Sequence, residues 1–375
     1  MKLHLVSLCF PCLLLSAPTW AADAAEFLSG VVWTIPFNPA PGKDYVYTQE
    51  EREKELRQMR SYGIEWVTLP CWGEMRDGQS TQVFLHPRSP TDPGGFRRAW
   101  IQKREREEII RTAHRLRMKV YLMPAFIPTH PKINLGGFEK SVTWRGVIEP
   151  VDWEAWFESY GVFIRFWAEF AQKEGVEMFC VGTELRSAEP YTEQWRRTIR
   201  KVRQVYKGPI AYAADWSSFD KPQFYDQVDV IGISAYFPLI TRPASQPPRL
   251  EDLVNSWRNI QKRVLRLKAE YGKPLIFNEI GYNAVEGVSR IPGNYKIWGR
   301  KPSLPEQTLC YRAFVQAWKD TPELDGTFIW SWGKGNKDGS WPDDAAYGFA
   351  GRPAGDLIRD FFLHRKKSGP PNNIK

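Results

Sequence analysis

The sequence contains few residues that bind metals or form disulfide bonds. Its 375 residues include 5 histidines and 5 cysteines. The histidines beyond residue 24 never occur at the spacing of metal ligands, so we expect neither a metal nor another cofactor. The cysteines beyond residue 24 are too few and too widely spaced to predict a disulfide framework. We interpret these three as small buried hydrophobic residues: Cys71, Cys180 and Cys310.

Two short functional motifs are also missing. No G-x-S-x-G sequence is present, which disfavours a serine nucleophile. No G-x-G-x-x-G turn follows the first predicted strand, which disfavours a dinucleotide-binding domain. The formal net charge is +9, and we interpret the basic residues first as solvated helix surfaces and second as an affinity for anionic glycans. No nucleic-acid-binding motif occurs, so nucleic acid is not an expected partner.

One long apolar run lies at the N-terminus, from Leu5 to Leu15. It is too short to span a membrane, it follows Lys2, and it precedes the small residues Ala22-Asp23-Ala24. This order is typical of a secretory signal peptide, which we place at residues 1–24, with cleavage after Ala21 or Ala22 as the alternative. We therefore expect a secreted or periplasmic protein without a membrane span.

Beyond the leader, apolar segments of strand length alternate with amphipathic segments of helix length. Thr48 and Glu51, for example, predict a capping box at the start of a helix over residues 48–62. This alternation predicts one domain over residues 25–375, a single (β/α)8 TIM barrel of the α/β class, with an open doubly wound sheet as the alternative. The predicted strands are 27–35, 64–72, 119–126, 177–185, 209–216, 229–237, 273–282 and 326–333.

Aromatic residues are abundant, with 17 tryptophans. A buried indole N–H needs a hydrogen-bond partner, so we expect many of these side chains to line a cleft. In a TIM barrel the active site forms at the carboxyl ends of the strands. The residues that end the predicted strands are Trp33, Trp72, Phe126, Glu184, Trp216, Tyr236, Glu279 and Trp332. Trp330 and Trp332 alternate, so only one of them can point into the barrel mouth.

Two carboxylates, Glu184 and Glu279, stand among these aromatic residues at the ends of strands four and seven. Across a barrel mouth these strands face each other, and paired carboxylates flanked by aromatic platforms are typical of glycosidic bond cleavage. Each residue alone also has a structural interpretation. Glu184 could cap a helix or pair with Arg186, and Glu279 could cap a helix or pair with an arginine to offset the cost of its burial.

Several segments resemble glycoside hydrolase family 113, a family of β-mannanases. They lie at 144–146 (WRG), 181–185 (VGTEL), 231–239 (IGISAYFPL), 278–282 (NEIGY) and 351–354 (GRPA). The resemblance covers nearly the whole mature chain and implies a retaining (β/α)8 enzyme with Glu184 as acid/base and Glu279 as nucleophile. It also implies Tyr236 beside the nucleophile and the strand-eight tryptophan under the reacting sugar. Ala125 stands where the family resemblance leads us to expect a histidine, which bears on specificity for mannan.

The predicted function is that of a retaining endo-β-glycosidase, an endo-β-1,4-mannanase-like hydrolase. The alternatives are a hydrolase of another β-glycan or an anionic exopolysaccharide, and a non-catalytic glycan-binding barrel. The expected partner is an oligo- or polysaccharide, and the expected oligomeric state is a monomer. Substrate-binding residues are expected to be Trp33, Trp72, Trp144, Arg145, Trp216, Tyr236, Asn278 and Trp332.

Overall fold

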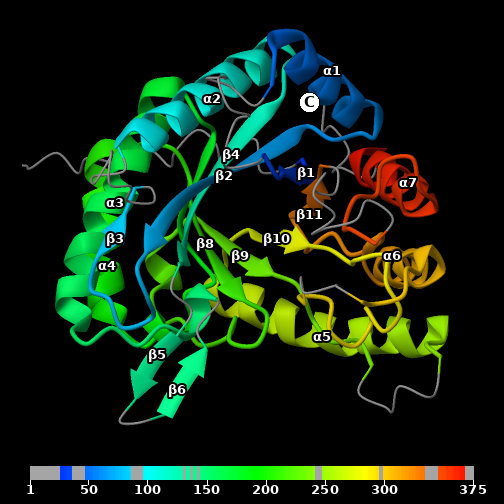
Figure 1. The fold of residues 1–375 in the computed structure, drawn as a ribbon. Coiled ribbons are helices and arrows are strands. Elements are labelled where there is room, and N and C mark those ends of the chain that lie inside the picture. The colour runs from blue at the N-terminus through cyan, green and yellow to red at the C-terminus, as the bar shows by residue number, and fades with distance from the viewer. Residues whose placement is uncertain are drawn as a thin grey trace, which may run out of the picture.

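The protein is described by a computed structural model over residues 26–35, 47–85, 96–129, 132–135, 138–141, 144–240, 247–294, 299–333 and 345–367. The predicted signal peptide, residues 1–24, lies outside these ranges. Within them, eight parallel strands form a closed barrel (Figure 1). In chain order they are β1 (Leu28–Trp33), β2 (Trp66–Met75), β4 (Lys119–Pro128), β7 (Met178–Thr183), β8 (Ile210–Asp215), β9 (Val230–Ser234), β10 (Leu275–Ile280) and β11 (Gly326–Trp332).

Closure of the sheet depends on β1, which pairs in parallel with both the last strand and the second. Gly30, for example, lies opposite Phe328 of β11 and Trp66 of β2. An open doubly wound sheet would leave β1 or β11 at an edge, so this alternative is excluded. The predicted single (β/α)8 barrel is confirmed.

Seven α-helices surround the barrel in the described ranges (Figure 1). The predicted capping box is present, since Thr48 Oγ1 accepts from the Glu51 amide at 3.2 Å and the Glu51 carboxylate accepts from the Thr48 amide at 2.7 Å. None of the helices in the described residues is long and apolar enough to cross a membrane. They are α1 (Gln49–Ser61), α2 (Phe96–Arg115), α3 (Trp153–Glu174), α4 (Thr192–Val205), α5 (Leu250–Tyr271), α6 (Leu304–Trp318) and α7 (Pro353–Lys367).

Two small additions to the barrel were not predicted. Strand β3 (Val83–Phe84) pairs antiparallel with the end of β2. Strands β5 (Lys132–Leu135) and β6 (Phe138–Ser141) form a two-stranded antiparallel sheet that projects from the barrel (Figure 1). Both lie in polar loops without a long apolar run, so hydrophobic periodicity could not reveal them.

The core has two layers. The barrel interior holds the cluster Val32, Tyr121, Met123, Met178, Cys180, Ala211, Ala213, Val230, Ile276 and Phe328. A larger cluster fills the space between strands and helices. The prediction that many tryptophans line a cleft is wrong for the seven that are buried, because the wide layer beneath the helices needs large side chains. These are Trp33, Trp156, Trp167, Trp195, Trp257, Trp318 and Trp332. The three predicted core cysteines are free and buried.

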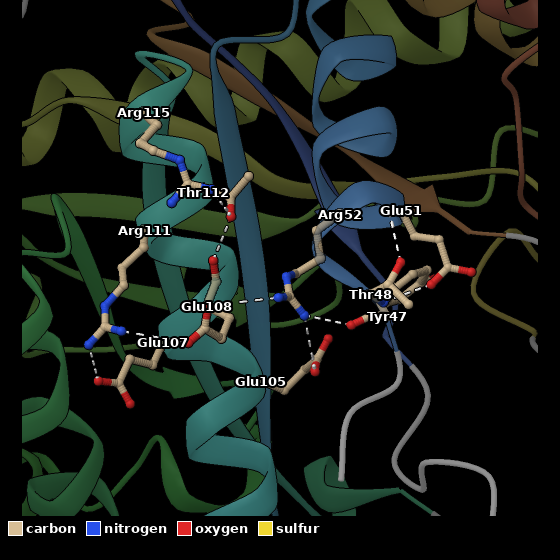
Figure 2. A network of polar contacts seen from close by, with 10 residues as sticks. All are labelled: Tyr47, Thr48, Glu51, Arg52, Glu105, Glu107, Glu108, Arg111, Thr112 and Arg115. Atoms are coloured by element: carbon tan, nitrogen blue, oxygen red, sulfur yellow. Dashed lines mark hydrogen bonds and ion pairs between the residues drawn. The ribbon is translucent and has the colours of Figure 1, made fainter. Parts of the chain in front are cut away.

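A buried arginine joins the first two helices (Figure 2). Arg52 of α1 donates to the Tyr47 carbonyl at 2.5 Å, and its guanidinium lies 4.0 Å from the Glu105 carboxylate and 3.7 Å from that of Glu108, both on α2. A buried cation requires such partners, because an unpaired charge in the core costs several kcal/mol. The network therefore fixes α1 against α2 beside the strands that close the barrel.

A second buried arginine fastens the last helix to the barrel. Arg365 of α7 donates to the carbonyls of Thr321 at 2.5 Å and Leu324 at 2.6 Å, in the turn that precedes β11. Its guanidinium also lies 4.4 Å from the ring centroid of Phe27, directly before β1. One side chain thus links the first and last segments of the barrel.

Arg365→Met should lower the free energy of unfolding by about 2–4 kcal/mol, since two buried carbonyls lose a charged donor. The midpoint of urea-induced unfolding measures this effect. Arg359→Met is the matched control, because Arg359 lies on the same helix in exposed ion pairs with Asp356 and Asp360 and should change stability by less than about 0.5 kcal/mol. Equal midpoints for the two variants would contradict the role of Arg365.

Candidate active site

Glu184 directly follows β7, where the barrel strand leaves its regular register. The pairing of β7 with β8 shifts between Cys180 and Thr183, and the Glu184 amide donates to the Ala213 carbonyl at 2.7 Å. Glu184 has a φ of 53°, in the left-handed region that costs a non-glycine residue about 1–3 kcal/mol. Such strain persists only where surrounding contacts hold it, and it turns the side chain at the strand end.

Two donors from the short helix η2 (Arg145–Val147) and the residue before it hold the Glu184 carboxylate. Trp144 Nε1 and Arg145 Nη2 both lie 3.0 Å from Glu184 Oε2. Arg145 Nε also donates to the Thr183 carbonyl at 2.8 Å. Among the described residues no donor contacts the other carboxylate oxygen, Oε1. The carboxylate is therefore anchored through one oxygen and free at the other.

Glu279 lies in β10, which shifts its register against β9 between Ile276 and Glu279. Such irregularities re-aim side chains at barrel rims. The Tyr236 hydroxyl donates to Glu279 Oε2 at 2.9 Å, and the side chain of Glu279 is buried. Burial raises the pKa of Glu279 to about 8, the negative charge of Glu184 adds to the rise, and Arg145 and Tyr236 oppose it.

The structure therefore brings the two predicted carboxylates into one site. Among the described residues, donors contact one oxygen of each carboxylate, Oε2 in both cases, although the donors differ. Glu184 accepts from a cation and an indole, whereas Glu279 accepts from a neutral phenol. Removing the last proton from the pair would leave two negative charges close together in a buried site. The pair therefore holds this proton to a higher pH than a carboxyl group in water would.

Asp215 is a third buried carboxylate at the mouth, and the strand pattern in the sequence did not predict it. It ends β8, accepts from the Ser217 amide at 3.1 Å and lies 3.9 Å from Arg186 Nη1. Burial raises its pKa, and the charge of Glu184 contributes to the rise. The predicted strand ended one residue later, at Trp216. Neighbouring residues of a strand point to opposite faces of the sheet. An error of one residue in the strand end therefore selects Trp216 in place of Asp215 as the residue at the mouth.

Tyr347, beyond β11, was also missed. Its ring centroid lies 6.4 Å from that of Tyr236, and burial together with the charge of Glu279 raises its pKa. The Tyr347 hydroxyl donates to the Pro292 carbonyl at 2.7 Å. No strand or helix pattern surrounds this residue in the sequence, so no periodicity pointed to it. Its hydrogen bond joins two loops of the mouth behind the nucleophile candidate.

The predicted aromatic residues divide into groups. Trp144 and Tyr236 contact the two carboxylates directly. The guanidinium of Arg186 also stacks on Trp144, 5.0 Å from the ring centroid. Trp72 and Trp216 are partly buried, and the ring of Trp216 packs against that of Phe237 at 6.1 Å. Within the described part of the chain, neither makes a hydrogen bond to the carboxylates, and their contact with substrate stays a prediction.

Trp33 and Trp332 lie in the outer core layer, away from the barrel interior. Trp33 is fully buried and packs against Tyr47, at a centroid distance of 5.3 Å. Trp332 donates from Nε1 to Glu55 of α1 at 2.7 Å. Trp330 instead packs on the inner cluster and is only partly buried. Of the two alternating tryptophans, the one that points inward is therefore Trp330.

Asn278 and Ala125, the two other positions that the sequence singled out, are both buried. Asn278 is fully buried, and its Nδ2 donates to Ser234 Oγ at 3.3 Å. It therefore holds β10 against β9 beside Glu279 and presents no surface of its own in the described structure. Ala125 lies in β4 opposite Trp72 and is nearly fully buried. The family resemblance predicts a histidine at this position. No imidazole stands at that position.

The arrangement suits acid/base and nucleophilic chemistry. Among the described residues, each member of the pair has one oxygen without a donor, and the pair retains a proton near neutral pH. Among the described residues no group of three or more histidine, cysteine, aspartate or glutamate side chains could hold a metal ion. The chemistry available from the described side chains is thus that of two carboxyl groups flanked by aromatic rings.

Comparisons with known proteins agree with this geometry. Two solved structures superpose over most of the chain at 25% sequence identity. One is described as a GH113 beta-1,4-mannanase, with a TM-score of 0.70, covering 90% of this chain and 99% of its own. The other is GH113 beta-mannanase AaManA from Alicyclobacillus acidocaldarius in complex with ManMIm. Its TM-score is 0.72, and the match covers 91% of this chain and 98% of that one.

More distant structures share the fold alone. A β-glucuronidase from Ruminococcus gnavus is 12% identical with a TM-score of 0.57, and the match covers 90% of this chain but 50% of that one. No curated protein matches the sequence. The model of one family, described as Glycoside Hydrolase Family 113, matches residues 37–350. Since this match spans most of the sequence and the mouth holds the two carboxylates, the chain belongs to Glycoside Hydrolase Family 113.

Proposed function

We propose that the protein is a retaining endo-β-1,4-mannanase that acts by double displacement. The observation that carries the proposal is the electrostatically coupled pair of Glu184 and Glu279, in which one oxygen of each carboxylate has no donor among the residues that the structure describes. Family membership supports a glycoside hydrolase, and the mannanases among the similar structures support β-mannan as the substrate class. We also propose export with removal of residues 1–24, which the N-terminal sequence of the exported protein tests.

In the first step of this mechanism, Glu279 Oε1 attacks the anomeric carbon while Glu184 gives its proton to the departing glycosidic oxygen. The bond to the leaving sugar breaks, and an ester to Glu279 forms. In the second step water attacks the same carbon, Glu184 accepts the proton of the water, and the ester bond breaks. Tyr236 holds Oε2 of Glu279 and so directs Oε1 toward the substrate.

The mechanism predicts retention of configuration, because two inversions occur at one carbon. Proton NMR during hydrolysis of mannohexaose should show the β-anomer of the new reducing end first, before mutarotation. Chromatography of the same reaction should show internal cleavage into mixed shorter oligosaccharides. Initial α-anomer would contradict double displacement. Cleavage of another β-glycan or an anionic polysaccharide, with mannan left intact, would favour the alternative substrate.

Glu279→Gln should reduce mannan hydrolysis by on the order of 10⁴-fold or more, because the amide cannot form the ester. Binding of mannohexaose, measured by isothermal titration calorimetry, should remain. Glu169→Gln is the matched control, since Glu169 is an exposed carboxylate on α3 that forms an ion pair with Arg165 on the same helix. If Glu279→Gln retained full activity, the residue would not be the nucleophile. A wild type that binds glycans and cleaves none would instead indicate a non-catalytic barrel.

Activity on unactivated mannan should fall as the pH rises through about 8, the pKa to which burial and Glu184 raise Glu279. Below this pH the coupled pair keeps one proton, which Glu184 can donate; above it both carboxyls are ionised and no acid remains. The pH profile of kcat/KM measures this limb. The Glu184→Gln variant, assayed with a dinitrophenyl β-mannobioside whose leaving group needs no acid, should show no such fall in kcat/KM at alkaline pH. An unchanged alkaline limb in this variant would contradict the assignment.

A further inference from the structure

The acid/base candidate has an unusual partner for a proton donor. Arg145 forms an ion pair with Glu184 at 3.0 Å, and both side chains are largely buried, with 12% and 11% of their surface exposed. A charge-assisted hydrogen bond of this kind stabilises the carboxylate and not the neutral acid. In the first half of the reaction Glu184 must be protonated, so the contact with Arg145 opposes ester formation. In the second half Glu184 must be ionised, so the same contact favours hydrolysis of the ester.

We propose that Arg145 is a positioning residue that acts mainly in the second half of the reaction, by keeping Glu184 ionised after the glycosyl ester has formed. The inference rests on the function proposed above and deepens it. Arg145 touches neither the anomeric carbon nor the leaving oxygen in this scheme. Its direct contacts are with the carboxylate of Glu184 and with the backbone that carries it, while its charge also opposes the rise in the pKa of Glu279.

The charges around Glu184 show why the second half needs a cation. Glu279 of β10 is negative before the first step and becomes a neutral ester after it. Asp215 of β8 is the buried carboxylate that still faces Glu184 at that stage. Asp215 is paired with Arg186, whose guanidinium is half-exposed and lies 3.9 Å away. Arg145 therefore provides the buried positive charge in direct contact with Glu184 and offsets the repulsion from Asp215.

The neutral groups at the mouth are arranged differently. Tyr236 follows β9 and donates to Glu279, and Tyr347 faces the nucleophile side from beyond β11. Both phenols have a pKa raised by burial, so neither carries charge during the reaction. Trp144 adds a neutral donor to the same oxygen of Glu184 that Arg145 contacts. Among these groups, only Arg145 combines a charge with direct contact to Glu184.

The geometry also selects the oxygen that takes the proton. Oε2 of Glu184 already accepts from Trp144 and Arg145, so the incoming proton of water goes to Oε1. The water oxygen forms its bond to the anomeric carbon as the bond from that carbon to Glu279 breaks. The electron pair of the broken bond returns to Glu279 as a carboxylate. The second contact of Arg145, to the Thr183 carbonyl, keeps Glu184 in its left-handed conformation throughout.

The two halves can be measured separately with 2-deoxy-2-fluoro-β-mannobiosyl fluoride. Inactivation by this probe reports ester formation, and the fluoride leaving group needs no acid. Reactivation in buffer reports hydrolysis of the ester. The plateau rate of inactivation should change by less than about 3-fold in Arg145→Met. The acid limb of the reactivation profile should instead move to higher pH, so that at a pH on that limb reactivation slows roughly 10- to 100-fold, the effect of losing a charged hydrogen bond.

Arg145→Lys and Trp144→Phe separate charge from packing. The lysine variant keeps a positive charge and should reactivate faster than Arg145→Met, while Trp144→Phe loses only a neutral donor and should slow reactivation less. Equal slowing by methionine and lysine, or equal slowing of inactivation and reactivation in Arg145→Met, would overturn the proposal. A wild type that never forms an adduct on Glu279, shown by peptide mass spectrometry, would instead refute the double-displacement function itself.

Discussion

The burial of two carboxylates in one barrel mouth is the constraint on which the rest of the site depends. Each would be ionised in water, and together they repel each other across a medium that screens charge poorly. The fold offsets this cost by holding one oxygen of each group and by letting the pair keep a proton, as the raised pKa of Glu279 shows. The donors differ on the two sides, and this difference separates the roles of the two residues.

The barrel places these groups through small departures from regular pairing. The register shifts at the ends of β7 and β10, and a third shift occurs between Val32 and Trp33 of β1. A regular strand alternates its side chains between the two faces of the sheet. The shifts and the left-handed backbone of Glu184 release the chain from this alternation where the functional side chains stand. Regular closure by β1 and β2 below keeps these irregular ends in place.

Much of the fold could be predicted because its physical signals are strong and local. Apolar runs of strand length alternate with amphipathic segments of helix length, and the capping box at Thr48 lies where the sequence indicates. The site was harder, because it depends on single residues at strand ends. Asp215 was missed by one position, and Trp330, not Trp332, faces the inner cluster. Tyr347 lies in a loop with no periodicity at all, so only tertiary packing reveals it.

The placement of arginine at this site has a wider consequence for the chemistry. A residue that must be an acid and then a base cannot be optimised for one state alone. Before the first step the ionised Glu279 places a negative charge beside Glu184, and that charge disappears when the ester forms. Arg145 remains in contact with Glu184 at 3.0 Å as a fixed positive charge in both states. The substrate itself, by esterifying Glu279, therefore changes the electrostatics that its hydrolysis requires.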